Sequence, residues 1–197
     1  MATAKPLRAD ARRNRDALLA KARELFAAGC FDLRFDDFAR LAGVGTGTLY
    51  RHFPNRAALA EAVYREELTA LCGHARTLQA TLPAAEALAA FLRGFVSHLH
   101  SHQGLARTLA TLVAARPDTL ADGGRELAQV IADLLAAGVD EGTVRDDVGA
   151  GSVLMVLQGI CTVCGQPGSR GDADGAVTLL LDGLRRQGAG QAGRTSS

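Results

Sequence analysis

Apolar residues recur at helical spacing along most of this chain, and no segment shows the alternation typical of a half-buried strand. A first stripe predicts a helix that begins at Asp10 or Arg12 and ends at Gly29, after an arm of mobile, basic residues at 1–10. Pro83 is expected to open a helix with a broad apolar face. The remaining stripes predict helices over 56–79, 123–139, 152–164 and 173–186, and an all-α fold.

Residues 36–56 have the spacing of two short helices joined by a tight turn. Phe38 and Ala39 fall on the inner face of the first helix, and Gly43 can take the left-handed backbone that ends it. Val44 and Leu49 are expected to pack back on Phe38 and Leu41. The outward side of the second helix then presents side chains suited to base edges and phosphates, namely Thr46, Gly47, Thr48, Tyr50, Arg51 and His52.

This segment resembles a known DNA-binding domain, because the TetR (tetracycline-repressor) family has the run G-V-x-x-G-T-L-Y-x-H-F-x-x-[KR]. The chain carries that run as Gly43, Val44, Gly47, Thr48, Leu49, Tyr50, His52, Phe53 and Arg56. The resemblance covers residues 12–65. It departs from the family at Arg34, where a Thr often caps the first helix of the pair, and at Gly45, where a Ser commonly caps the second. Loss of a Thr cap costs about 1 kcal/mol, whereas Gly costs only a few tenths.

The resemblance implies a three-helix helix-turn-helix domain, joined by a long helix to a C-terminal helical domain for ligand binding and dimerisation. The expected boundaries are 1–55 for the arm and DNA-binding domain, 56–80 for the connecting helix, 81–187 for the effector domain and 188–197 for a disordered tail. The expected function is a ligand-responsive transcriptional regulator, a repressor released from its operator by a small apolar molecule. The residues expected to contact double-stranded operator DNA are Arg12, Arg13, Arg34, Thr46, Gly47, Thr48, Tyr50, Arg51, His52 and Arg56.

Specific operator binding is expected to require a homodimer, because one recognition helix reads only a few base pairs. In the family the last two helices pair with their copies in a four-helix bundle. The expected interface consists of Val153, Leu157, Ile160, Val177, Leu180, Leu181 and Leu184. Pockets between bundle helices are common ligand sites, and the expected effector lining is Phe91, Phe95, His98, Leu99, His102 and Met155.

Charge is unevenly distributed along the chain. Residues 1–65 hold 12 Lys/Arg against 7 Asp/Glu, and residues 66–197 hold 10 against 14. A basic module that neutralises phosphates, followed by an acidic effector module, explains this asymmetry, and a solvated helix surface is the alternative explanation. The first 20 residues lack the apolar core of a secretory signal, and the longest apolar stretch, Val153–Val163, is too short to span a bilayer. The protein is therefore expected in the cytoplasm.

Two residue pairs keep an enzyme or a small helical binding protein open as alternatives. His98 and His102 share a helix face at the spacing that suits Zn or Ni, but no acidic or cysteine ligand lies within a turn of them. Cys161 and Cys164 form a C-x-x-C without a second pair, which favours buried thiols over a redox or metal site. The sequence thus predicts no catalytic residue, metal or cofactor. A helical adaptor would leave the polar face of 45–52 unexplained.

Overall fold

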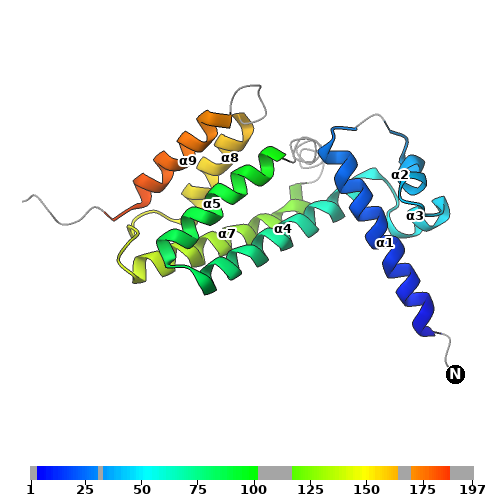
Figure 1. Ribbon diagram of the computed structural model, residues 1–197, viewed down its shortest axis with the longest axis horizontal. Coiled ribbons are helices and arrows are strands. Elements are labelled where there is room, and N and C mark those ends of the chain that lie inside the picture. The colour runs from blue at the N-terminus through cyan, green and yellow to red at the C-terminus, as the bar shows by residue number, and fades with distance from the viewer. Residues whose placement is uncertain (1–3, 31–32, 102–116, 164–169, 187–197) are drawn as a thin grey trace, which may run out of the picture. The chain divides into compact units, whose positions relative to one another are not determined.

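The computed structural model describes residues 4–30, 33–101, 117–163 and 170–186, and these are helical nearly throughout (Figure 1). The prediction of an all-α fold is confirmed. Within those ranges the extended pairing is limited to an isolated bridge between Val144 and Arg185, and no helix is long and apolar enough to cross a membrane. The helices are α1 (Ala4–Ala27), α2 (Phe35–Leu41), α3 (Thr46–His52), α4 (Arg56–Thr81), α5 (Ala84–Ser101), α7 (Pro117–Asp140), α8 (Ala150–Val163) and α9 (Arg170–Leu184).

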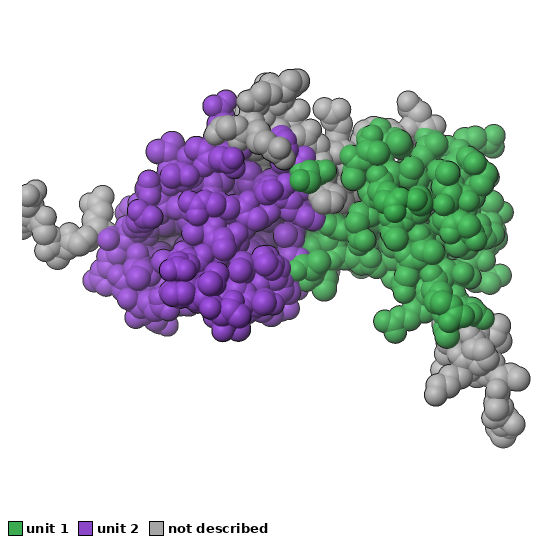
Figure 2. Space-filling view, viewed as in Figure 1, with its two compact units in different colours: residues 1–70, 101–123 green, residues 71–100, 124–197 purple. Residues whose placement is uncertain are grey.

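The chain divides into two compact units (Figure 2). Unit 1 comprises residues 1–70 and 101–123, and unit 2 comprises residues 71–100 and 124–197. The division between residues 70 and 71 falls inside α4, so one continuous helix carries the chain from the first unit into the second. The boundaries at 55, 80 and 187 that the sequence predicts stay predictions.

Unit 1 is held together by apolar residues from α1, α2, α3 and the beginning of α4. Phe38, Ala39 and Leu49 are fully buried, which confirms the predicted inner faces of the two short helices. Phe26 of α1 lies 5.5 Å from Phe38, measured between ring centroids. The prediction that Leu41 belongs to this core is wrong, because 39% of it is exposed. Leu41 is the last residue of α2, and the neighbouring residues Ala42 and Val44 pack against the core instead.

Helices α1, α2 and α7 end with the same hydrogen-bonded turn around a glycine. At the end of α2 the Val44 N–H donates to the Ala39 carbonyl at 2.9 Å, and the Gly43 N–H donates to the Arg40 carbonyl at 3.2 Å. Gly43 adopts φ +69°, which is the left-handed backbone predicted from the sequence. This turn fixes the direction in which the chain leaves α2 and enters α3.

Unit 2 is built around the stripes of α5 and α7, with α8 and α9 packed against them. Pro83 precedes α5 as predicted, and the Glu141 carboxylate accepts the N–H of Ala84 through both oxygens, at 3.2 and 3.0 Å. This contact ties the beginning of α5 to the residue after α7. The buried stripe residues of α5 and α7 are Ala87, Leu88, Phe91, Leu92, Phe95, Val96, Leu127, Val130, Ile131, Leu134 and Leu135.

Two predicted irregular segments are helical. Helix α1 begins at Ala4, where the sequence predicts a mobile arm up to residue 10, and α7 begins at Pro117, before the helix that the sequence predicts over 123–139. The reason is the same at both sites. Proline lacks an N–H, but the first turn of a helix leaves its N–H groups without intrahelical partners, so Pro6 and Pro117 fit there. The sequence also predicts a short helix between residues 104 and 115, but that segment lies outside the described residues, as do His102, Cys164 and the tail 188–197.

Candidate nucleic-acid interface

Helix α3 is anchored on one side and exposed on the other. Leu49, in the middle of α3, is fully buried, and Phe53, the residue after α3, is 4% exposed, so the middle and the C-terminal end of the short helix are fixed to the unit 1 core. Thr46, Gly47, Tyr50 and Arg51 are exposed, and Thr48 and His52 are half-buried. The helix contains no acidic residue. The predicted polar face is therefore open to a polyanion.

No contact within the described part of the protein requires a glycine at position 47. A Cβ built at this position meets no atom within 4 Å, and the backbone is ordinary helix. An exposed helical glycine costs about 1 kcal/mol relative to alanine. Close approach of a partner surface is a role that would offset this cost.

Tyr50 is oriented by residues of α2. Its ring lies edge-on to Phe35, with 5.3 Å between centroids and 82° between the ring planes, while 51% of the residue is exposed. A hydrogen bond to Asp36 raises the pKa of the Tyr50 hydroxyl, with a smaller contribution from burial. Residues of α2 therefore hold the ring of Tyr50 in place beside the exposed face of α3.

The predicted arginines differ in what they contact. Arg12 and Arg34 are exposed, and Arg13 is also exposed but pairs with Asp10 on α1. The guanidinium of Arg56 lies 5.5 Å from the centroid of Phe38, so this residue also packs on the core. Arg56 therefore packs on the core in addition to any contact that it makes with a phosphate.

The predicted helix-capping consequences of Arg34 and Gly45 are observed. Neither side chain caps its helix. The Asp37 carboxylate partly compensates at α2, because it accepts the backbone N–H of Arg34 at 3.1 Å. Asn55 caps α4 through a 2.9 Å hydrogen bond from the Ala58 N–H to its side-chain oxygen.

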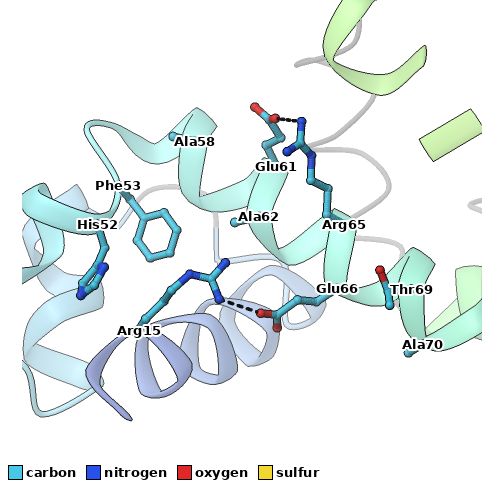
Figure 3. Close-up of a pocket in the computed structure, with 10 residues that line it drawn as sticks. All are labelled: Arg15, His52, Phe53, Ala58, Glu61, Ala62, Arg65, Glu66, Thr69 and Ala70. Carbon is cyan, nitrogen blue, oxygen red and sulfur yellow. Dashed lines mark hydrogen bonds and ion pairs between the residues drawn. The ribbon is translucent and has the colours of Figure 1, made fainter. Parts of the chain in front are cut away.

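A group of charged residues that the sequence analysis missed lies between α1 and α4. The Arg15 guanidinium donates to Glu66 at 3.2 Å, and Arg23 donates to both Glu66 and Glu67. Figure 3 shows Arg15 and Glu66 on the wall of a hollow of about 600 Å³, which Phe53, His52 and residues of α4 also line. The signal was present in the sequence: Arg15 shares a helical face with Leu18, Leu19 and Ala22, and Glu66 and Glu67 continue the face of Leu59 and Val63.

The predicted effector lining does not come together as one site. Phe91 and Phe95 are closed into the unit 2 core, at 1% and 6% exposure, and Met155 is 72% exposed. His98 and Leu99 are half-buried. A cavity of about 490 Å³ in unit 2 is lined instead by residues around the Val144–Arg185 bridge, including Arg145 and Asp147. The exposure of Met155 does not fit an enclosed pocket in the single chain, and the effector lining as a whole stays a prediction.

Most of the predicted dimer interface is also internal. Five of the predicted residues are buried in the unit 2 core of the single chain, namely Val153, Leu157, Val177, Leu181 and Leu184. Because these side chains already pack in the core of the single chain, the predicted interface at these positions stays a prediction. Ile160 and Leu180 are partly buried. The large apolar residues that are exposed on α8 and α9 are Met155, Val156 and Leu179, at 72%, 44% and 75%.

No metal-binding cluster of His, Cys, Asp or Glu occurs among the described residues. His98 lies within this part of the chain, whereas His102 and the side chains of Cys161 and Cys164 lie outside it. Cys72 is fully buried, and burial raises the pKa of its thiol, with a further contribution from Glu126.

Comparison with known proteins gives a family match for each of the two parts of the chain. Residues 18–63 match the family model for bacterial regulatory proteins of the tetR family, and residues 83–186 match the C-terminal domain of SbtR-like transcriptional regulators. The HTH-type transcriptional repressor KstR2 of Mycolicibacterium smegmatis is 29% identical over 141 residues, which are 68% of this chain and 69% of the relative.

Two solved structures extend the similarity over nearly the whole chain. The TetR transcriptional regulator SCO0520 from Streptomyces coelicolor is 38% identical with a TM-score of 0.72, over 88% of this chain and 99% of that one. The TetR transcription regulatory protein from Mycobacterium vanbaalenii is 34% identical with a TM-score of 0.69, over 92% and 100%. The matched proteins are regulators of transcription and not enzymes.

Proposed function

Because this chain belongs to the TetR family of transcription regulators, we propose that it acts in the cytoplasm as a homodimeric repressor that binds operator DNA through α3 and is released by a small molecule. The observation that carries DNA recognition is the outward face of α3. It is free of acidic residues, it has hydroxyl and guanidinium groups, and it includes Gly47, whose missing side chain allows close approach. These groups suit base edges and phosphates.

We expect different side chains to read bases and to bind phosphates. Thr46 is exposed in the first turn of α3, and its hydroxyl and methyl suit a base edge. Arg12 is exposed on α1 and suits the DNA backbone. Arg12 serves as a cleaner test of a phosphate contact than Arg56, because Arg56 also packs on Phe38.

The test begins by selecting preferred duplexes from a randomised pool with the full chain, then measuring affinity by fluorescence anisotropy at several salt concentrations. Thr46→Ala should weaken binding to the selected duplex by about 1–3 kcal/mol and relax preference at one base position. Thr69→Ala, the same change on exposed α4 surface, is the control and should have no effect. Arg12→Ala should weaken binding to every duplex and reduce the salt slope by about 1. Equal losses from the Thr46 and Arg12 variants on all sequences would contradict these roles.

A homodimer is proposed from the exposed apolar side chains of α8 and α9. The two helices lie side by side (Figure 1), and their outward side chains Met155, Val156 and Leu179 are solvent-exposed in the single chain. Exposed apolar side chains on neighbouring helices are typical of an interaction surface. Two copies related by a two-fold axis would cover this surface and carry two recognition helices.

Release by a small molecule is proposed from the size of unit 2 and the continuity of α4. A ligand lowers DNA affinity only if it binds one arrangement of the helices better than another, and α4 runs unbroken from beside α3 into unit 2. A thermal-shift screen of small molecules, followed by release from the selected duplex, tests this step. A molecule that stabilises the protein and leaves duplex affinity unchanged would argue against coupling.

A further inference from the structure

Arg15 of α1 contacts two other helices at once. Its guanidinium carbon lies 5.9 Å from the centroid of the Phe53 ring, and its Nη1 donates to Oε1 of Glu66 on α4 at 3.2 Å. Phe53 is the residue at which α3 ends, and its N–H donates to the Leu49 carbonyl at 2.8 Å. One side chain therefore joins α1, α4 and the end of the recognition helix α3 (Figure 3).

Glu66 is shared between two arginines of α1. Its Oε1 accepts from Arg15, and its Oε2 accepts from Arg23 at 3.3 Å. Arg23 also pairs with Glu67, whose side chain is only 12% exposed. The four residues form one chain of ion pairs along the contact between α1 and α4, with Glu66 at its centre.

This chain of ion pairs fixes the orientation of α1 relative to α4 and contributes less than the apolar core to the stability of unit 1. Leu18, Leu19 and Leu59 are fully buried in the same unit 1 core, and the hydrophobic effect that buries them is less directional than a hydrogen-bonded ion pair. A guanidinium is planar and donates in fixed directions, and it stacks on an aromatic face in one orientation. Arg15 makes both kinds of contact, so it links the orientation of Phe53 to the position of Glu66.

We propose that Arg15 and Glu66 are positioning residues for DNA recognition, which hold the end of α3 at the angle that the preferred duplex requires. The inference rests on the proposed binding of duplex DNA through α3. Neither residue belongs to the outward face of α3, so their proposed role is to position that face rather than to read a base. Their effect is on the affinity for the preferred sequence relative to other sequences.

The same hollow contains a matched control pair. Arg65 donates to Glu61 at 2.8 Å, and both residues lie on α4, so this ion pair joins no two helices. Glu66→Gln and Glu61→Gln remove the same charge from the same helix, five residues apart. Only the first change releases Arg15.

The experiment measures affinity of the full chain for the selected duplex and for a scrambled duplex of equal length, with a thermal unfolding curve for each variant. Glu66→Gln should lower the ratio of the two affinities about threefold to tenfold, which lies within the lower part of the range of coupling between contacting residues. Glu61→Gln should leave the ratio unchanged. A purely structural role for Glu66 would lower the unfolding temperature and leave the ratio unchanged, which would overturn the proposal.

Arg15→Lys provides a second variant, because it keeps the positive charge and removes the planar fork. It should reduce the affinity ratio as Glu66→Gln does, and the double variant should lose no more than either single change. An Arg15→Lys protein that retains the full ratio would overturn the proposal, since Arg15 would then act through its charge alone. Absence of any sequence preference in the unaltered protein would overturn the proposed function itself, which distinguishes the two failures.

Discussion

Leu179→Glu should separate the proposed dimer into folded monomers, whereas Leu181→Glu should unfold the chain. The two residues are two positions apart on α9, and they differ in exposure: 75% for Leu179 and 8% for Leu181. Full burial of a leucine contributes about 1.5–3 kcal/mol. Since three-quarters of Leu179 is exposed in the single chain, a partner can recover about 1–2 kcal/mol per copy.

A two-fold dimer contains the substitution twice, so Leu179→Glu should cost roughly 2–4 kcal/mol of association free energy before any cost of burying the carboxylates. The dissociation constant of the dimer should then rise about 30-fold to 1,000-fold. Leu181→Glu places a carboxylate inside the unit 2 core, where an unpaired charge costs several kcal/mol of a total stability of about 5–15 kcal/mol.

Sedimentation equilibrium over a range of concentrations measures the dimer constant, and circular dichroism during heating measures folding of each variant. A dimer constant unchanged within twofold in Leu179→Glu would refute the assignment of the outward face of α9. A folded, monomeric Leu181→Glu protein would refute the argument from burial, because it would mean that the inward face is the interface.

Two further predictions concern the fold. Gly43→Ala should lower the free energy of unfolding by about 1 kcal/mol in urea titrations, because alanine disfavours φ of +69° although a new Cβ meets nothing within 4 Å. The same change at exposed, helical Gly94 should raise the free energy of unfolding by about 0.5–1 kcal/mol. Equal effects at the two positions would contradict the left-handed turn. Cys72 should react with iodoacetamide more slowly than half-buried Cys30. Because burial raises the pKa of the Cys72 thiol, the unfolded chain loses this proton at a lower pH than the folded protein, so the free energy of unfolding should fall above about pH 8.5. Cys72→Ala should remove this pH dependence, and an unchanged dependence would assign it to other groups.

The helix-turn-helix could be predicted from local patterns in the sequence, because the residues that form it lie close together along the chain. Phe38, Ala39 and Leu49 are buried at the predicted spacing, and Gly43 supplies the predicted left-handed turn. The same reasoning misplaced the beginnings of α1 and α7. Neither segment carries an apolar stripe that would have indicated a helix, and a proline is compatible with the first turn of both helices.

The side of a helix that faces a partner could not be predicted from periodicity. A stripe such as Val177, Leu181 and Leu184 shows that one side of α9 is buried, but the same stripe would serve the chain's own core or a second subunit. The structure assigns it to the core and leaves Leu179 outside. The pair Arg15 and Glu66 was missed for a related reason: the residues are 51 positions apart, and no local pattern connects them.

A helix of seven residues cannot hold its own shape in water, because isolated helices shorter than about 12 residues are marginal. The geometry of α3 is therefore imposed by its neighbours: the turn at Gly43 before it, Leu49 in the core beneath it, and Phe53 under Arg15 after it. The first two contacts belong to α2 and the core of unit 1, whereas the third leads through Glu66 into α4, the helix that continues into unit 2. Any change in α4 that moves Glu66 must then act on the end of α3 that lies farthest from the turn. Sequence preference should accordingly depend on residues of α4 that contact no DNA.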